Sequence, residues 1–114
     1  LVEDGMIIAM DTEETLRDLG VAEVTIAAKV SSALKELEAE SYDLAVLDYN
    51  LGTESSEPVA VKLNELGVPF WLATGYGEMA DRLEEIGALG VLTKPYGKDE
   101  LRRMLGKYSE IAKG

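Results

Sequence analysis

Four short apolar segments, far apart in the sequence, are each followed by a side chain that is useful in chemistry. The residues that follow them are Glu3-Asp4, Asp48, Thr74 and Lys94. Carboxylate oxygens suit a hard cation such as Mg²⁺, and a carboxylate can also attack phosphorus as a nucleophile. A hydroxyl and an ammonium group stabilise charge on phosphoryl oxygens. If the fold gathers these residues, they predict a metal-assisted phosphoryl-transfer site.

The acidic residues divide into metal ligands and a nucleophile. Asp4 and Asp48 are expected to hold Mg²⁺, with Glu3 acting directly or through water, because a cation relieves the repulsion between three neighbouring acids. Asp48 is expected to attack the phosphorus in line and form an acyl phosphate. Thr74 and Lys94 are then expected to stabilise charge on the phosphoryl oxygens, together with the metal.

Each of these residues has an ordinary structural interpretation when it is taken alone. Glu3-Asp4 suits a helix N-terminus, and Asp48 suits a turn. Thr74 before Gly75 suits a turn or a helix cap, and Lys94 suits a solvated surface charge. Their joint order and spacing, each at the end of an apolar segment, favours a common site.

Apolar segments alternate with segments of helical period along the chain, which predicts five βα units. The expected strands cover residues 1–2, 24–28, 42–47, 68–73 and 90–93, and the expected helices 6–19, 31–39, 57–66, 78–86 and 98–111. Ile8, Leu16 and Leu19 are expected on the buried face of the first helix, and Gly67 is expected to end the third. Residues 50–56 are expected to form a polar loop.

Right-handed crossovers between parallel strands predict an α/β fold of flavodoxin-like (βα)5 type. The expected sheet is doubly wound, parallel and five-stranded, with the order 2-1-3-4-5. The chain is expected to form one domain over residues 1–114, with its first strand truncated at the N-terminus. Ligands of such sheets bind at the carboxyl ends of the strands, where the four segments above would meet.

The composition excludes several classes of function. The chain has 114 residues, a net charge of −11, and neither cysteine nor histidine. Disulfides, thiolate chemistry and Ser-His or Cys-His nucleophile pairs are therefore excluded. The negative charge disfavours nucleic-acid binding, and no apolar run suggests membrane contact. A cytoplasmic location is expected.

Four motifs carry a resemblance to a known family along essentially the whole chain. They are Leu1-Val2-Glu3-Asp4, Ala45-Val46-Leu47-Asp48, Leu72-Ala73-Thr74-Gly75 and Leu92-Thr93-Lys94-Pro95. Together they resemble the receiver domain of bacterial response regulators in two-component signalling. The resemblance implies that Asp48 is the phosphorylated residue, with Mg²⁺ bound beside it.

The same resemblance implies roles for the other matching residues. Glu3 and Asp4 correspond to the acidic pair, and the main-chain carbonyl of Asn50 to a third magnesium ligand. Thr74 corresponds to the switch hydroxyl and Lys94 to the phosphate-pairing lysine, with the Lys94-Pro95 peptide in the cis form.

A narrower resemblance involves the segments around Glu3-Asp4, Asn50-Leu51-Gly52 and Pro69–Gly77. These segments look like receivers fused to hybrid histidine kinases of the HWE type, and like stand-alone receivers of alphaproteobacterial stress signalling. Two positions depart from the common receiver pattern: Val91 stands where many members have Tyr or Phe, and Gly52 where many have Pro. In place of the aromatic residue missing at position 91, Tyr76 or Tyr96 is an alternative route for the signal, and each also fits ordinary packing or partial cover of the surface.

The partners follow from the chemistry and the resemblance. Because the chain has no histidine, the phosphoryl donor is expected to be a histidine kinase or histidine phosphotransfer protein, and a downstream protein partner is expected to read the result. The fourth helix, fifth strand and fifth helix form the candidate docking surface. On it, Leu101, Met104 and Leu105 are either docking residues or ordinary core.

Three alternative functions use the same elements. A haloacid-dehalogenase-like phosphatase also has a strand-end aspartate, but it needs an acid two residues later, where Asn50 stands. A flavin- or nucleotide-binding module needs a glycine-rich loop after the first strand, where Glu3-Asp4 stands instead. A degenerate receiver would act only as a docking module, and the complete acid, threonine and lysine set argues against it.

Overall fold

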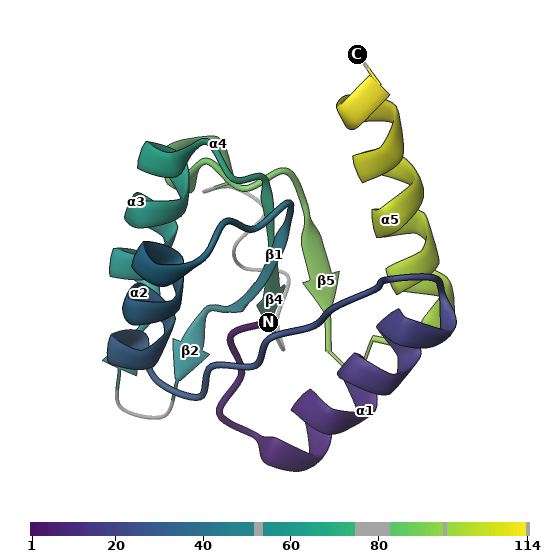
Figure 1. Cartoon of the computed structure of the whole chain (residues 1–114), viewed down its shortest axis with the longest axis horizontal. Coiled ribbons are helices and arrows are strands. Elements are labelled where there is room, and N and C mark those ends of the chain that lie inside the picture. Colours follow the sequence, from purple (N-terminus) through teal and green to yellow (C-terminus); the bar gives the residue numbers. More distant parts are fainter. Residues whose placement is uncertain (52–53, 75–82, 95, 114) are drawn as a thin grey trace.

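The centre of the molecule is a parallel sheet of three strands, in the order β1-β4-β5. The computed structural model describes residues 1–51, 54–74, 83–94 and 96–113. In this part of the chain the sheet consists of β1 (Ala45–Asp48), β4 (Phe70–Thr74) and β5 (Val91–Thr93). Figure 1 shows the sheet between two groups of helices, so the molecule has the three layers of an α/β fold.

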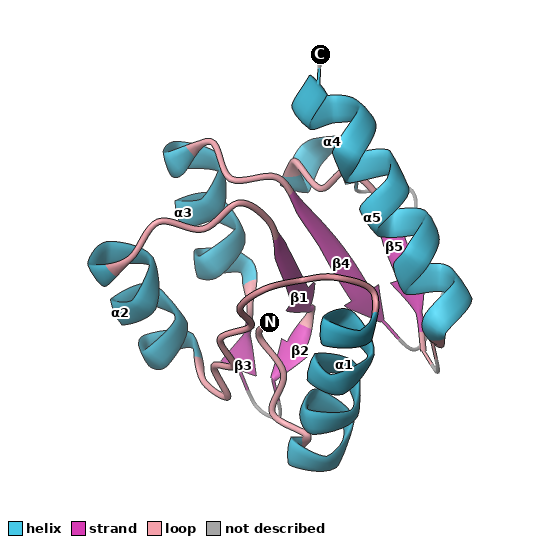
Figure 2. Ribbon diagram, turned by 45° about the vertical axis from the view of Figure 1, so that its right-hand side comes forward, coloured by secondary structure: helices cyan, strands magenta, loops and turns pink. Residues whose placement is uncertain are grey.

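Among the described residues, helices cover both faces of the sheet (Figure 2). One face carries α1 (Met6–Asp18) and α5 (Lys98–Lys113), and the other carries α2 (Val30–Ala39) and α3 (Glu57–Leu66). A short helix, α4 (Leu83–Ile86), packs beside α3. Among the described residues, no helix is both long and apolar enough to cross a membrane.

Alternate residues of each strand face the two layers of helices. The side chains that pack toward α2 and α3 are Ala45, Leu47, Phe70, Leu72 and Val91. Those that pack toward α1 and α5 are Val46, Trp71, Ala73 and Leu92. Because both faces are covered, β1 and β4 are buried along their whole length, which explains their nearly continuous apolar sequences.

The first two predicted strands are present only as isolated bridges. Val2 forms single parallel bridges to Ala27 on one side and to Leu47 on the other. The backbone bonds that support the bridge to Ala27 run from Glu3 N to the Ala27 carbonyl at 3.0 Å and from Ala27 N to the Leu1 carbonyl at 2.9 Å. The prediction of a strand over residues 24–28 is therefore wrong in its length, the truncated first strand is reduced to the two bridges of Val2, and the five-stranded order stays a prediction.

Several element boundaries also differ from the predictions. The predicted polar loop contains a short antiparallel hairpin, β2 (Asn50–Leu51) with β3 (Glu54–Ser55). Only the last turn of the predicted helix 78–86 lies within the described residues, as α4. Gly67 ends α3 as predicted, with a φ of 71° that glycine adopts without strain.

The buried face of α1 includes Leu16 and Leu19, as predicted, but not Ile8. Ile8 is 45% exposed, whereas Ala9, Thr12 and Leu16 are buried. Residues 9, 12 and 16 follow the i, i+3, i+7 spacing of one helical face, and residue 8 lies at the edge of that face. The expectation that Ile8 is a core residue is wrong, and α1 instead presents an exposed apolar surface.

Burial decides between the two interpretations of Leu101 and Met104 on α5. Leu101 and Met104 are buried in the core against Trp71 and Leu92, and Leu105 is half-buried. Leu101 and Met104 are therefore core residues and cannot act as docking contacts.

Candidate functional site

Backbone hydrogen bonds hold the ends of the strands together at one edge of the sheet. The amide of Asp48 donates to the Val2 carbonyl at 2.9 Å, and the amide of Lys94 donates to the Thr74 carbonyl at 2.8 Å. In the register of the sheet, Asp48 lies opposite Ala73, the residue before Thr74. All four predicted segments therefore end at the same edge, as the topology required.

The ammonium group of Lys94 connects two of the acids. Its Nζ atom lies 2.8 Å from Asp48 Oδ2, and 3.0 and 3.3 Å from Glu3 Oε2 and Oε1. Glu3, Asp48 and Lys94 thus form one ion-paired group, although Glu3 and Lys94 lie 91 positions apart in the chain. Hydrogen bonds between charged groups are short and strong in such surroundings.

The acids of this group are almost completely buried. Glu3 is 2% exposed and Asp48 is 6% exposed, and Thr74 at the end of β4 is buried as well. A buried carboxylate is costly unless it is paired and hydrogen-bonded, which the Lys94 ammonium provides. The backbone amide of Gly5 adds a bond to Glu3 Oε1 at 3.3 Å.

Gly5 is a site residue that the sequence did not single out. A Cβ atom at this position would lie 2.9 Å from Glu3 Oε1, closer than real Cβ contacts allow. Its missing side chain therefore lets the backbone of the Asp4–Met6 segment approach the Glu3 carboxylate. The signal in the sequence is a glycine directly after an acidic pair.

The electrostatics of the group raise two pKa values. Burial raises the pKa of Glu3 to about 7, helped by the hydrogen bond and charge of Asp48, while Lys94 acts in the opposite direction. Burial alone would lower the pKa of Lys94, but its hydrogen bonds to Asp48 and Glu3 outweigh this effect and raise it. Lys94 therefore stays a cation at neutral pH.

The acidic residues fit a hard divalent cation. One carboxylate oxygen each of Glu3, Asp4 and Asp48 lies within 4.8 Å of the others, and Asp4 is exposed while the other two are buried. Oxygen-only donors of this kind match Mg²⁺, which also keeps several of its waters. Asn50 is the first residue of β2, two residues beyond Asp48.

Some predicted features fall outside the described residues. Pro95 is one of them, so the cis form of its peptide bond stays a prediction, as do the roles of Gly52 and Tyr76. Tyr96 is described and half-buried. Its hydroxyl lies 3.1 Å from the hydroxyl of Thr12 in α1, a residue that the sequence gave no reason to select.

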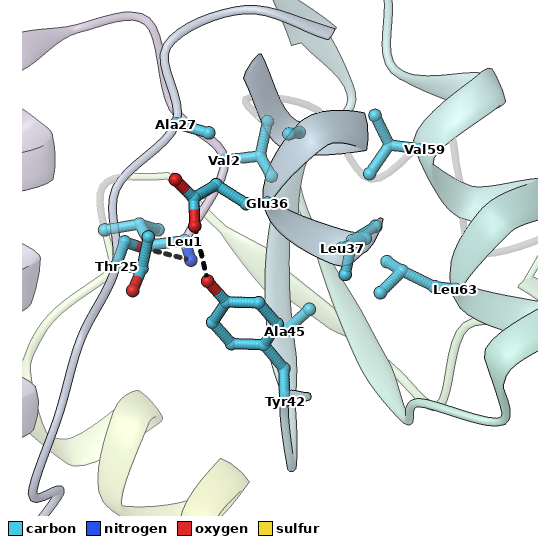
Figure 3. A pocket seen from close by; sticks show the side chains of 11 residues that line it. Leu1, Val2, Thr25, Ala27, Glu36, Leu37, Tyr42, Ala45, Val59 and Leu63 are labelled. Carbon is cyan, nitrogen blue, oxygen red and sulfur yellow. Dashed lines mark hydrogen bonds between the residues drawn. The ribbon is translucent and has the colours of Figure 1, made fainter. Parts of the chain in front are cut away.

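A small apolar cavity lies at the other end of β1. This amino-end cavity, of about 40 Å³, lies beside Ala45 and is lined mainly by apolar side chains of α2, α3 and the first residues of the chain. Figure 3 shows Tyr42 and Glu36 meeting at its side, where the Tyr42 hydroxyl donates to Glu36 Oε2 at 2.8 Å. Asp48 is not among the described residues that line it, so the cavity lies apart from the acidic group.

A three-layered parallel α/β fold, with acids and a lysine converging at the carboxyl ends of its strands, defines the class of receiver proteins. The chain matches the family described as the response regulator receiver domain over residues 1–106. It therefore belongs to this family and is a receiver domain of two-component signalling.

Individual relatives agree with this assignment. The transcriptional regulatory protein CutR of Streptomyces coelicolor is 33% identical over 118 positions, covering 97% of this chain and 54% of CutR. The chain thus spans about half the length of this curated relative. The crystal structure of a CheY-like receiver from Methanospirillum hungatei is 29% identical, with a TM-score of 0.86 over 98% of this chain and 93% of that one.

A second solved structure was determined with a bound ion. It is the response regulator TrrA of Thermotoga maritima, in complex with Mg²⁺ and BeF. TrrA is 27% identical to this chain, with a TM-score of 0.82 and coverage of 94% of each chain.

Proposed function

We propose that Asp48 accepts a phosphoryl group from the phosphohistidine of a partner protein, and that this modification switches protein–protein interactions. The contact between Lys94 Nζ and Asp48 Oδ2, at 2.8 Å, carries the proposal. It places a fixed positive charge beside a buried carboxylate at the edge of the sheet where ligands of this fold bind.

The transfer step uses the residues of this chain as follows. A carboxylate oxygen of Asp48 attacks the phosphorus, and its O–P bond forms while the N–P bond to the donor imidazole breaks. The electron pair of that bond returns to the imidazole nitrogen of the donor. The Lys94 ammonium moves from Glu3 toward the new phosphoryl oxygens, and the Thr74 hydroxyl donates to another of them.

The donor histidine lies on another domain or another protein, because these 114 residues contain none. A histidine kinase or a histidine phosphotransfer protein supplies it. The domain catalyses only its own phosphorylation and dephosphorylation, and it turns over no separate substrate. Its net charge of −11 disfavours direct contact with nucleic acid.

Glu3, Asp4, Asp48 and the main-chain carbonyl of Asn50 are the residues that would hold Mg²⁺. When bound, Mg²⁺ supplies charge neutralisation for the acids and for the incoming phosphoryl group. The complex of the relative TrrA with Mg²⁺ and BeF supports this part of the proposal.

Labelling by a phosphorylated donor tests the assignment of Asp48. With a ³²P-labelled histidine kinase and Mg²⁺, Asp48→Asn is expected to take up no label, because the amide is not a nucleophile. Asp43→Asn, an exposed acid five residues earlier, is the matched control and should label like the wild type. Chelation with EDTA should stop labelling of the wild type. Label on Asp48→Asn, or full labelling in EDTA, would overturn the proposal.

The apolar surface of α1 supports a location for the donor. Met6, Ile7 and Met10 are exposed there, and Ile7 is 86% exposed. The helix starts two residues after Asp4, so a protein that reaches Asp48 from this side also covers these side chains. We propose that the donor packs against them, because an exposed apolar patch beside a reaction site marks a protein contact.

Ile7→Glu separates docking from chemistry. It should slow transfer from the phosphorylated kinase by about tenfold or more, because it places a charge in an apolar contact. Labelling by acetyl phosphate, a small donor, should not change. Val61→Glu, at an exposed valine on α3, is the matched control and should affect neither reaction. Equal slowing with both donors would exclude a docking role.

A further inference from the structure

We propose that Tyr96 is a positioning residue for the phosphoryl-transfer site, and that it acts through Lys94. Its hydroxyl is anchored to Thr12 of α1, and this anchor fixes the segment that carries the lysine. The inference rests on the proposed function, since it concerns the residue that pairs with the phosphoryl group.

Thr12 is a buried polar residue on an otherwise apolar face. It is 4% exposed and lies between Ala9 and Leu16 on the side of α1 that faces the core. A buried hydroxyl needs a hydrogen-bond partner, and the Tyr96 hydroxyl at 3.1 Å provides it. Thr15, by contrast, bonds within its own helix, to the Asp11 carbonyl at 2.9 Å. The Thr12 bond therefore links two segments 84 positions apart.

The two segments are those that carry the site. Helix α1 begins two residues after Asp4, and Tyr96 stands two residues after Lys94. Figure 1 shows α1 lying against the start of α5, where these segments meet. Thr12, Tyr96 and Lys94 also line one surface hollow, together with Ile7, Ile8 and Asp11.

Lys94 is thus held from both sides. Its own amide is fixed to the Thr74 carbonyl of β4 at 2.8 Å, and the residue two positions later is fixed to α1. A lysine side chain is long and flexible, and a fixed backbone limits the positions that its ammonium samples, which favours simultaneous contact with two acids. Small displacements of a positioning group have large effects on rate.

The chemistry of Tyr96 suits this role. Burial raises the pKa of Tyr96, and the charges of Glu3 and Asp48 add to the rise, while the Thr12 hydrogen bond and Lys94 oppose it. The phenol therefore stays protonated at neutral pH and keeps its capacity to donate. Tyr96 also packs partly against the α1 and α5 side of the core, so its ring can stay in place when only the hydroxyl is removed.

Removal of either hydroxyl tests the inference. Tyr96→Phe and Thr12→Val should each slow phosphorylation of the full chain by acetyl phosphate and Mg²⁺ by roughly fivefold to tenfold. Thr12→Ser keeps a hydroxyl and should retain most of the wild-type rate. Tyr42→Phe removes a different hydrogen-bonded tyrosine hydroxyl, at the amino-end cavity, and should leave the rate unchanged.

A second background separates positioning from general stability. In Lys94→Ala, the further change Tyr96→Phe should have no effect on the rate, because the group that it positions is gone. An equal slowing in both backgrounds would overturn the inference, as would an unchanged rate for Tyr96→Phe in the wild-type background.

A spectroscopic readout keeps this inference distinct from the proposed function. In metal-free protein, the paired Lys94 ammonium should give a slowly exchanging ¹⁵N resonance, which Tyr96→Phe should broaden and Thr12→Ser should preserve. If the wild type accepts no phosphoryl group at all, the proposed function fails and the resonance still decides the role of Tyr96. An unperturbed Lys94 resonance in Tyr96→Phe would overturn that role.

Discussion

The two ends of the sheet use hydrogen-bonded titratable groups in different ways. At the carboxyl end, Lys94 pairs with Asp48 and Glu3, which lie 46 and 91 positions away. Beside the amino-end cavity, Tyr42 pairs with Glu36, which lies only six positions away. The first arrangement exists only once the whole sheet has formed, whereas the bond between Tyr42 and Glu36 joins a helix to the segment that directly follows it.

The difference indicates that the carboxyl end of the sheet carries the reaction site. A local pair such as Tyr42 and Glu36 satisfies polar groups at the border of an apolar hollow, which folding alone explains. The carboxyl end brings two acids together under burial, against their mutual repulsion and the loss of hydration. Such an arrangement is expected where a cation and an incoming phosphoryl group must be bound.

Removal of Lys94 should have the largest effect on the carboxyl end. In EDTA, Lys94→Ala should lower the free energy of unfolding by about 3 kcal/mol, because two buried carboxylates lose their counter-charge. Mg²⁺ should recover much of the loss, since it neutralises the same acids. Urea unfolding followed by the fluorescence of Trp71, the only tryptophan and a buried one, measures both values.

A matched variant is Lys107→Ala on α5, where the exposed ammonium makes a long contact of 3.5 Å to the Leu89 carbonyl. Lys107→Ala should change the free energy of unfolding little, and by the same amount with and without Mg²⁺. If Lys94→Ala lowered the free energy of unfolding in EDTA as little as Lys107→Ala does, the buried acids would not depend on the Lys94 ammonium for their stability.

The protonation of Glu3 should give the carboxyl end a characteristic pH dependence. Its pKa is about 7 in the folded protein against 4.5 ordinarily, so the folded state binds the proton more tightly. The resulting stabilisation is fully present below pH 4.5 and is lost as the pH rises through 7. Unfolding in EDTA at several pH values should show a loss on the order of 2 kcal/mol across this window.

Glu3→Gln isolates this effect from the other titrating groups. The difference in unfolding free energy between wild type and Glu3→Gln should fall between pH 4.5 and 7 and stay constant above that range. A difference that rises with pH would mean that the pairing with Lys94 dominates over burial. The Mg²⁺-dependent stabilisation should grow over the same window, because the metal binds the ionised form.

The parts of this structure that the sequence predicted are those with strong local signals. The strands before Asp48 and Thr74 are buried on both faces and therefore read as continuous apolar segments. Gly67 marks the end of α3 because the left-handed conformation there favours glycine. That Lys94 lies close to Asp48 followed from the rule that parallel strands end at one edge.

The parts that the sequence did not predict depend on tertiary contacts. Ala27 lies at the edge of the sheet, where one bridge to Val2 replaces a full ladder. Ala9 is buried and its neighbour Ile8 is exposed, although both are apolar, because the contacts of α1 with the core decide which of the two faces inward. The bond between Thr12 and Tyr96 joins segments 84 positions apart in the chain, and no local pattern indicates it.

The smallest expected effect belongs to the amino end. Tyr42→Phe removes a hydroxyl that donates to Glu36 at 2.8 Å, so it should lower the free energy of unfolding by about 1 kcal/mol. The loss should be the same in EDTA and in Mg²⁺, because Glu36 takes no part in the acid cluster. Labelling by the kinase should not change. A Mg²⁺-dependent loss for Tyr42→Phe would instead show that the two ends are energetically coupled through β1, whose first residue borders the cavity and whose last is Asp48.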